Sequence, residues 1–264
     1  MPLLTPLARG ILNILSPETV SFGGRTLPAP RLRFGGAHFR SNEAFLRSGQ
    51  AEAARLREQC GLTRDSRLLD IGCGPGRLPI GILSVVGDIA AYRGVDVSKT
   101  PIRWCRKHIT PAHPAFQFLH INVRNARYNP SGASMDDRFR LPFADSSFDI
   151  IYLYSVFSHM GAEDVRKYLR EYARLLAPGG SVFLTAFVEE GVPPVEENPA
   201  GYGNMPWKGA LHCVRFEAGF LAGLVRGAGL QITRRSHGTE TDGQSAFLLQ
   251  KLDPEPPTHH ATSI

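Results

Sequence analysis

The sequence predicts an α/β fold built on a parallel β-sheet, and three observations support this. Leu68 to Ile71 reads as a hydrophobic strand that runs through a glycine-rich turn into an apolar helical segment. Short apolar strands and helical segments then alternate along the chain, which is typical of parallel strands joined by right-handed crossovers. A length of 264 residues, 42% of them hydrophobic, suits one α/β domain with a sizeable core plus an appended segment.

The hydrophobic periodicity predicts most of the elements in order. Prolines and glycine pairs punctuate residues 1–40, so we expect an irregular or helical N-terminal extension there. Residues 41–252 are expected to form the folded domain, and the polar, proline-rich residues 253–264 a disordered tail. Within the domain we expect helices at 41–60, 78–91, 101–109, 162–176 and 215–228, and strands at 92–97, 116–121, 148–154, 181–187, 230–235 and 246–250.

Two segments fall outside this alternation. Residues 188–211 contain Glu189, Glu190, three prolines and Trp207, and a loop this long predicts an active-site lid or a substrate wall. Met1 to Leu15 is moderately apolar, and we expect a helix packed on the core or over the active site, with a helix on a membrane surface as the alternative. No signal peptide and no membrane span are expected.

Charge and cysteine usage narrow the function classes. The formal charge is +6 and the isoelectric point about 9.3, but the basic residues are dispersed and aromatic residues do not interleave with them. The densest group, Arg103, Arg106 and Lys107, has the spacing of a solvated helix face, so no nucleic-acid partner is expected. The four cysteines form no Cys-x-x-Cys pair, which indicates reduced thiols in a cytoplasmic protein and no metal site.

The glycine turn is the strongest local signal. Gly72, Gly74 and Gly76 follow a Gly-x-Gly-x-Gly pattern, whereas a dinucleotide turn would need a glycine at position 77, which is Arg. Asp70 precedes the turn and can accept hydrogen bonds from its amides or, through water, from a ligand ammonium group. Asp96 closes the next strand, where a carboxylate can accept both hydroxyls of a ribose.

Together these motifs resemble the class I S-adenosylmethionine-dependent methyltransferases, in particular the bacterial small-molecule type. The first motif of the family is similar to Leu69 to Gly76, and its ribose-binding acid falls on Asp96. Leu141 to Ile150 and Ser155 to Met160 resemble the segments before and after its fourth strand, and Leu176 to Gly180 resembles the turn into its fifth. The extended segment 124–140 also resembles this subfamily.

The resemblance implies a fold, a cofactor and a set of binding residues. The fold is a Rossmann-like, seven-stranded, mostly parallel sheet with helices on both faces and an antiparallel last strand, and the cofactor is S-adenosylmethionine. The expected cofactor-binding residues are Asp70, Gly72, Cys73, Gly74, Gly76, Asp96, Val97, Asn122, Val123 and Ser155. Asn122 is expected to accept from the adenine amino group, although the family often carries Asp there.

Two residues after the fourth strand are the expected catalytic residues. An unperturbed histidine has a pKa of about 6.5, so His159 is expected to suit a general base, with a helix-capping or helix-orienting role as the alternative. Tyr154, together with Ser155, is expected to shape the methyl-transfer channel. Glu189, Glu190, His212 and His237 are further candidates on the acceptor side, each with a solvated or structural role as the alternative.

These observations predict a methyltransferase acting on a small-molecule acceptor, with oxygen of a secondary or sugar-containing metabolite as the leading target. Nitrogen and carbon acceptors stay open, because the cofactor half of the sequence does not report on the acceptor. Three alternatives come from other classes. They are a nicotinamide-dependent oxidoreductase, which needs the missing glycine, a catalytically silent cofactor-binding protein, and an RNA-contacting surface.

Overall fold

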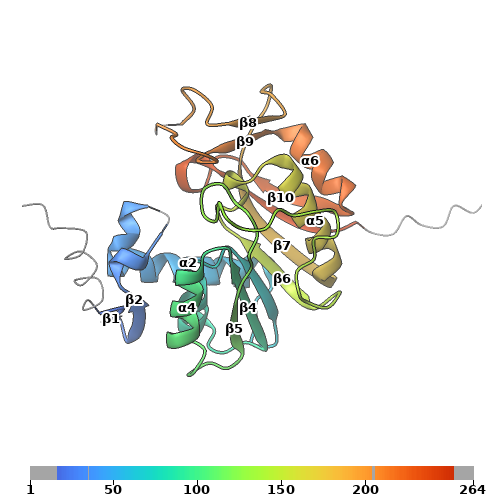
Figure 1. The fold of residues 1–264 in the computed structure, drawn as a ribbon. Coiled ribbons are helices and arrows are strands. Elements are labelled where there is room, and N and C mark those ends of the chain that lie inside the picture. The colour runs from blue at the N-terminus through green and yellow to red at the C-terminus, as the bar shows by residue number, and fades with distance from the viewer. Residues whose placement is uncertain (1–16, 35, 204–205, 253–264) are drawn as a thin grey trace, which may run out of the picture. The chain divides into compact units, whose positions relative to one another are not determined.

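The structure is a computed structural model that describes residues 17–34, 36–203 and 206–252 (Figure 1). These residues form two compact units, which we call the N-terminal unit (residues up to 65 together with 73–121) and the C-terminal unit (66–72 together with residues from 122 on). The expected helix at Met1 to Leu15 and the expected disordered tail from residue 253 lie outside the described residues.

The N-terminal unit combines a hairpin, three helices and two parallel strands. In chain order it contains β1 (Thr19–Phe22), β2 (Arg25–Pro28), two 3-10 turns (Pro30–Leu32 and Ala37–Arg40), α2 (Asn42–Cys60), α3 (Arg77–Val85), β4 (Ala91–Asp96), α4 (Lys99–His108) and β5 (Phe116–His120). β1 and β2 are antiparallel, whereas β4 and β5 are parallel and align Asp96 with His120. The carboxyl ends of these two strands therefore lie at one edge.

The ends of the helices follow from capping residues. The Ser41 hydroxyl accepts a hydrogen bond from the amide of Ala44 and starts α2, and Gly61 in the left-handed conformation ends it. Helix α3 was expected to run to residue 91 but ends at Val85. The expectation is wrong for residues 86–91 because Gly87 has a φ of +92° and residues from Ala91 on already belong to β4.

The C-terminal unit is built on a mixed sheet. It contains β3 (Arg67–Ile71), β6 (Phe148–Leu153), a 3-10 turn (Phe157–His159), α5 (Ala162–Leu175), β7 (Leu176–Glu189), β8 (Val195–Glu197), β9 (Val214–Glu217), α6 (Ala218–Gly227), β10 (Leu230–Ser236), a 3-10 turn (Thr241–Gly243) and β11 (Ser245–Lys251). The strand order is β10, β11, β7, β6, β3, with β3, β6 and β7 parallel and β11 antiparallel to both neighbours. Helices α5 and α6 pack on this sheet (Figure 1).

The predicted fold class is confirmed, with two more strands than expected. The described residues hold seven strands in the C-terminal unit and a parallel pair in the N-terminal unit besides the hairpin, and β11 is the antiparallel last strand. The additional strands are β8 and β9, which pair with each other, and β9 also pairs in parallel with the last residues of β7. Hence the segment after β7 is partly strand, and the helix expected from residue 215 begins only at Ala218.

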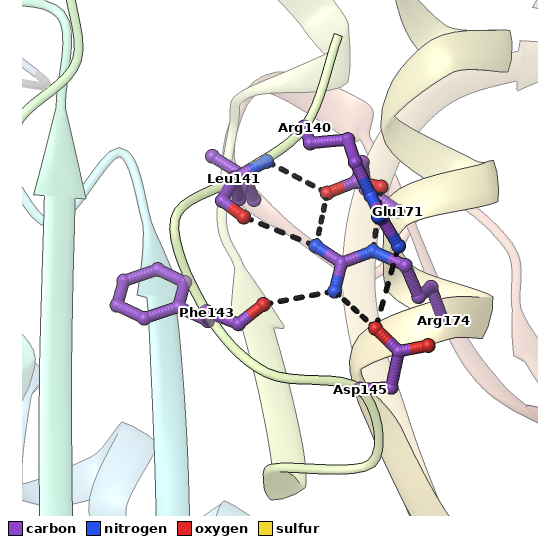
Figure 2. A network of polar contacts seen from close by, with 6 residues as sticks. All are labelled: Arg140, Leu141, Phe143, Asp145, Glu171 and Arg174. Atoms are coloured by element: carbon purple, nitrogen blue, oxygen red, sulfur yellow. Dashed lines mark hydrogen bonds and ion pairs between the residues drawn. The ribbon is translucent and has the colours of Figure 1, made fainter. Parts of the chain in front are cut away.

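A polar network fixes the chain that enters β6, as Figure 2 shows. The guanidinium of Arg174 on α5 donates to both carboxylate oxygens of Glu171, at 2.8 and 2.6 Å, and to the carbonyl oxygens of Leu141 and Phe143. A further bond to Asp145 spans 2.7 Å, and Glu171 also accepts from the amide of Leu141. The side chains of Arg174 and Glu171 are only 13% and 6% exposed. This buried pair therefore holds residues 141–145, which precede β6, against α5.

Candidate functional site

In the N-terminal unit, the second half of the glycine turn leads into α3. The amide of Cys73 donates to the carbonyl of Val95 in β4, and the amide of Gly76 donates to the carbonyl of Cys73. Gly74 has a φ of +51°, and a Cβ placed on it would meet no other atom within 4 Å. The turn therefore exposes bare backbone to open space, which is the arrangement that lets a flat polar ligand approach it.

Asp96 is held at the end of β4 by two backbone amides. Its carboxylate accepts from Gly74 at 2.9 Å and from Ser98 at 2.7 Å, so the acid and the glycine turn are joined directly. Burial raises the pKa of Asp96, while these hydrogen bonds counteract the rise. Each carboxylate oxygen retains acceptor capacity beyond one amide bond, and Val97 follows directly.

In the C-terminal unit, the first half of the turn lies at the end of β3. Asp70 is 2% exposed and pairs in register with Tyr152 of β6. A Cβ on Gly72 would come within 2.7 Å of the Val156 side chain, so the residues that follow β6 pack directly against this glycine. Asp70 and Gly72 therefore lie beside the carboxyl end of β6.

Asn122 and Val123 begin the segment after β5. The Asn122 side chain is exposed, and its carbonyl oxygen accepts from the Asn129 amide at 3.2 Å. The Asn129 amide also donates to the backbone carbonyl of Val123. One acceptor position on Asn122 is thus used within the loop, and a second remains for a ligand donor.

Ser155 occupies a strained position at the end of β6 and is embedded in a polar ring. It has a φ of +57°, which is rare for a residue with a side chain. Its amide donates to the Thr185 hydroxyl at 2.8 Å, its own hydroxyl accepts from the Gln244 amide at 2.9 Å, and Thr185 donates to Gln244 at 2.8 Å. The hydroxyl of Ser158 lies 3.1 Å from that of Ser155. Because Thr185 and Gln244 are 0% and 1% exposed, the ring holds this backbone rigidly.

Tyr154 connects the same strand end to the turn before β11. Its hydroxyl lies 2.9 Å from the Thr241 hydroxyl, donates to the Glu240 carboxylate at 3.2 Å and accepts from the Thr241 amide at 3.3 Å. Tyr154 is half-buried and its phenol is engaged by the 239–244 turn. The arrangement places a phenol beside a carboxylate at the carboxyl end of β6.

His159 is locked by three contacts. Its Nδ1 donates to the carbonyl of Leu211 at 2.9 Å, its backbone carbonyl accepts from Asn125, and its ring contacts Tyr128 edge to face at 5.4 Å. Burial is the main cause that lowers the pKa of His159 to about 4. The ring is therefore neutral near pH 7, with Nε2 as the unprotonated nitrogen.

The expected lid or wall segment is tied down at several points. The Asn198 side chain accepts from the backbone amide of Cys213 and donates to the backbone carbonyl of Gly209. The amide of Leu211 donates to the Glu197 carboxylate at 2.7 Å. Both Asn198 and Leu211 have positive φ angles of 50°. Tyr202 and Trp207 pack edge to face on Phe187 of β7. We call the described part of residues 197–213 the wall segment.

Several residues of this region were not singled out by sequence reasoning. Thr185 and Gln244 complete the polar ring around Ser155, and the Asn125 side chain donates to the backbone carbonyl of His159. A threonine inside the apolar run 182–188 was the available signal, because a buried hydroxyl needs a partner. The partner, Gln244 directly before β11, could not be found from local sequence.

Comparison with known proteins supports one family. The methyltransferase domain family matches residues 69–184. Methyltransferase GfsG of Streptomyces halstedii is 26% identical over 57% of this chain and 48% of its own length. An O-methyltransferase of Aspergillus nomiae is 31% identical over 53% of this chain and 55% of its own. The solved structure of the 4+2 cyclase SpnF aligns with a TM-score of 0.53 and 18% identity, over 76% of this chain and 80% of that one.

The chain spans about half the length of these curated relatives. The matched region carries the glycine turn, Asp96 and strands β3 to β7, and its fold is that of the structural neighbours. Residues 69–184 therefore match the methyltransferase domain family, and the fold is the one that class I S-adenosylmethionine-dependent methyltransferases share. S-adenosylmethionine is the cofactor of this class. Within residues 17–34, 36–203 and 206–252, no helix is long and apolar enough to cross a membrane.

Proposed function

We propose that this chain transfers a methyl group from S-adenosylmethionine to a small-molecule acceptor, and that the acceptor atom is an oxygen. The observation that carries the proposal is the bond between the Asp96 carboxylate and the amide of Gly74, which joins a ribose-binding acid to an open glycine turn. The O-methyltransferase of Aspergillus nomiae supports the choice of oxygen. Nitrogen and carbon acceptors are the alternative.

The residues of the N-terminal unit fit the ribose end of the cofactor. Asp96 offers carboxylate oxygens for two ribose hydroxyls, and Gly74 leaves its backbone uncovered, whereas Gly76 packs against Ile109 and Cys105. Cys73 and Val97 flank these positions. We also assign residues of the C-terminal unit to cofactor binding, because they match the family motif or follow the carboxyl ends of strands. These are Asp70 and Gly72 at the end of β3, Asn122 and Val123 after β5, and Ser155 after β6.

The acceptor side is assigned to His159 and Tyr154. The bound sulfonium supplies an electrophilic methyl group, so the chain has to align the acceptor oxygen, exclude water and receive a proton. His159 presents only Nε2 as a basic nitrogen, because Nδ1 donates to Leu211. Its lowered pKa makes it a weak base, which suits an acceptor that loses its proton as the new bond forms. Tyr154 orients the acceptor.

Calorimetry with S-adenosylmethionine, S-adenosylhomocysteine and NAD tests the cofactor assignment. We expect the two sulfur nucleotides to bind and NAD not to bind. Asp96→Ala should weaken binding by about 10- to 100-fold, because a charged acceptor of two hydroxyls is lost. Asp88→Ala is the matched control, since this acid is exposed in the same unit and pairs with His113. Unchanged affinity of Asp96→Ala would refute the ribose assignment.

A product assay must then separate methyl transfer from other chemistry. The same fold occurs in a protein described as a 4+2 cyclase, so the fold alone does not select the reaction. Methylated product from any of a panel of phenols, alcohols and amines, with release of S-adenosylhomocysteine, supports the proposal. Tight cofactor binding without product from the whole panel would favour the silent cofactor-binding alternative.

A further inference from the structure

A polar pocket lies in the C-terminal unit, at the ends of β7 and β10. It measures about 490 Å³ and is lined by Glu189, Glu190, Arg235 and His237. This volume is within the range of sites that bind small metabolites. Because β7 and β10 run in the same direction, the pocket opens at the edge of the sheet where Ser155 also lies.

The charged groups of this pocket form two loose pairs. Arg235 lies 3.6 Å from the Glu190 carboxylate, and Nε2 of His237 lies 3.5 Å from the Glu189 carboxylate. Both separations exceed the 2.7–2.9 Å that is usual for a hydrogen bond between opposite charges. Each pair therefore presents one acceptor and one donor that are not bonded tightly to each other.

His237 is oriented by its neighbours rather than freely placed. Its Nδ1 lies 3.1 Å from the hydroxyl of Ser245, a fully buried residue, and 3.3 Å from the guanidinium of Arg235. The Ser245 oxygen in turn accepts from the amide of Gly238. In this chain of bonds Nδ1 is the acceptor, so the proton resides on Nε2 and points toward Glu189. The second carboxylate oxygen of Glu189 accepts from the Tyr202 hydroxyl at 3.1 Å.

The chemistry of the two pairs selects a class of ligand group. An ammonium offers only donors and would leave the guanidinium of Arg235 and the Nε2–H of His237 without an acceptor, whereas a carboxylate or phosphate offers only acceptors and would be repelled by Glu189 and Glu190. A hydroxyl both donates and accepts, so one hydroxyl can bridge each pair without bringing a charge. Two adjacent pairs match two hydroxyls of one ring or chain.

The position of the pocket relates it to the proposed methyl-transfer point. Thr185, which bonds to the amide of Ser155, precedes Glu189 by four residues on β7, and the two side chains share one face. The distance along the strand is about 13 Å, which is the length of a mid-sized metabolite. Between them lies Phe187, covered by Tyr202 and Trp207 of the wall segment.

The geometry points to a recognition subsite in which Glu189, Glu190, Arg235 and His237 bind a neutral polyhydroxylated group, such as a sugar ring, at the end of the acceptor remote from the methylated oxygen. The inference rests on the proposed function for its place in catalysis, but the binding itself does not require turnover. Glu189 and His237 form the inner pair of the subsite, and Arg235 and Glu190 the outer pair.

Protein NMR on the full chain tests this subsite directly. Methyl β-D-glucopyranoside, putrescine and inorganic phosphate are titrated separately into labelled protein, with and without S-adenosylhomocysteine. We expect the glucoside to shift the amides of residues 189–191 and 235–238, and Glu189→Gln to weaken this binding by about tenfold. Glu163→Gln, an exposed acid on α5 that pairs with Arg166, is the matched control and should leave the titration unchanged.

Three results would overturn the subsite. They are no glucoside shift at these amides, an equal glucoside titration in Glu189→Gln, and stronger shifts there from putrescine or phosphate than from the glucoside. Failure of the proposed function would be recognised separately, because calorimetry would then show no binding of S-adenosylmethionine while the glucoside shifts persisted.

Discussion

Removal of the Arg174 side chain should destabilise the protein strongly, because this side chain holds the segment before β6. Arg174→Ala takes away both bonds to the Glu171 carboxylate and the donors to the carbonyls of Leu141 and Phe143. Glu171 is then a buried charge that keeps the hydrogen bond from the amide of Leu141. Breaking a buried pair in this way costs about 3–5 kcal/mol, so we expect the free energy of unfolding to fall by that amount.

Urea denaturation followed by circular dichroism measures this loss, with the denaturant slope checked for constancy. Arg174→Lys should lose about 1–3 kcal/mol, because an ammonium cannot bond the carboxylate and two carbonyls in the same plane. The double variant Arg174→Met with Glu171→Leu should recover much of the loss, since no charge is left buried. Arg166→Ala, at an exposed pair with Glu163, is the surface control and should not change stability measurably. A loss below about 1 kcal/mol for Arg174→Ala would refute the reasoning.

Three further predictions concern the proposed site. Burial lowers the pKa of His159 from its ordinary value of 6.5 to about 4 in the folded protein. Between these two pH values the unfolded chain binds a proton at His159 and the folded protein does not. The free energy of unfolding should therefore fall by about 3 kcal/mol as the pH drops from 6.5 to about 4. His159→Gln should remove this contribution to the pH dependence of the free energy of unfolding, measured by urea denaturation at several pH values. An unchanged pH dependence in the variant would contradict the prediction. Thr185→Val should cost about 1–3 kcal/mol, because it leaves the half-buried amide of Ser155 without its acceptor, while Thr185→Ser should be close to neutral. Gly74→Ala should lower stability by about 1 kcal/mol through its φ of +51°, and it should also weaken S-adenosylhomocysteine in calorimetry; wild-type affinity would show that the turn does not meet the ligand.

The sequence predicted the fold because its signals are local. Glycines at 72, 74 and 76, the apolar strands and the helix caps at Ser41 and Gly61 act over a few residues, and their structural consequences appear as expected. The early end of α3 was missed because Gly87 was read as part of an apolar helix. Strands β8 and β9 were missed because each is short and pairs only with distant chain.

The candidate site was less accessible to sequence reasoning, for a physical reason. Its key bonds join residues far apart in the chain, such as Thr185 to Gln244 and His159 to Leu211. A histidine or threonine in the sequence carries no mark of its partner, so burial and a lowered pKa emerge only when tertiary contacts form. The roles assigned to Asp96, His159 and Tyr154 remain predictions.

The wall segment has a consequence for how an acceptor is captured. Since Asn198, Leu211 and Trp207 are held by hydrogen bonds within the protein, part of the conformational entropy of this stretch is lost during folding. An acceptor would then meet a preformed surface, and its association should be a single concentration-dependent phase without a slower closing step. Turnover in such an enzyme would be limited by chemistry or product departure, and not by movement of this segment.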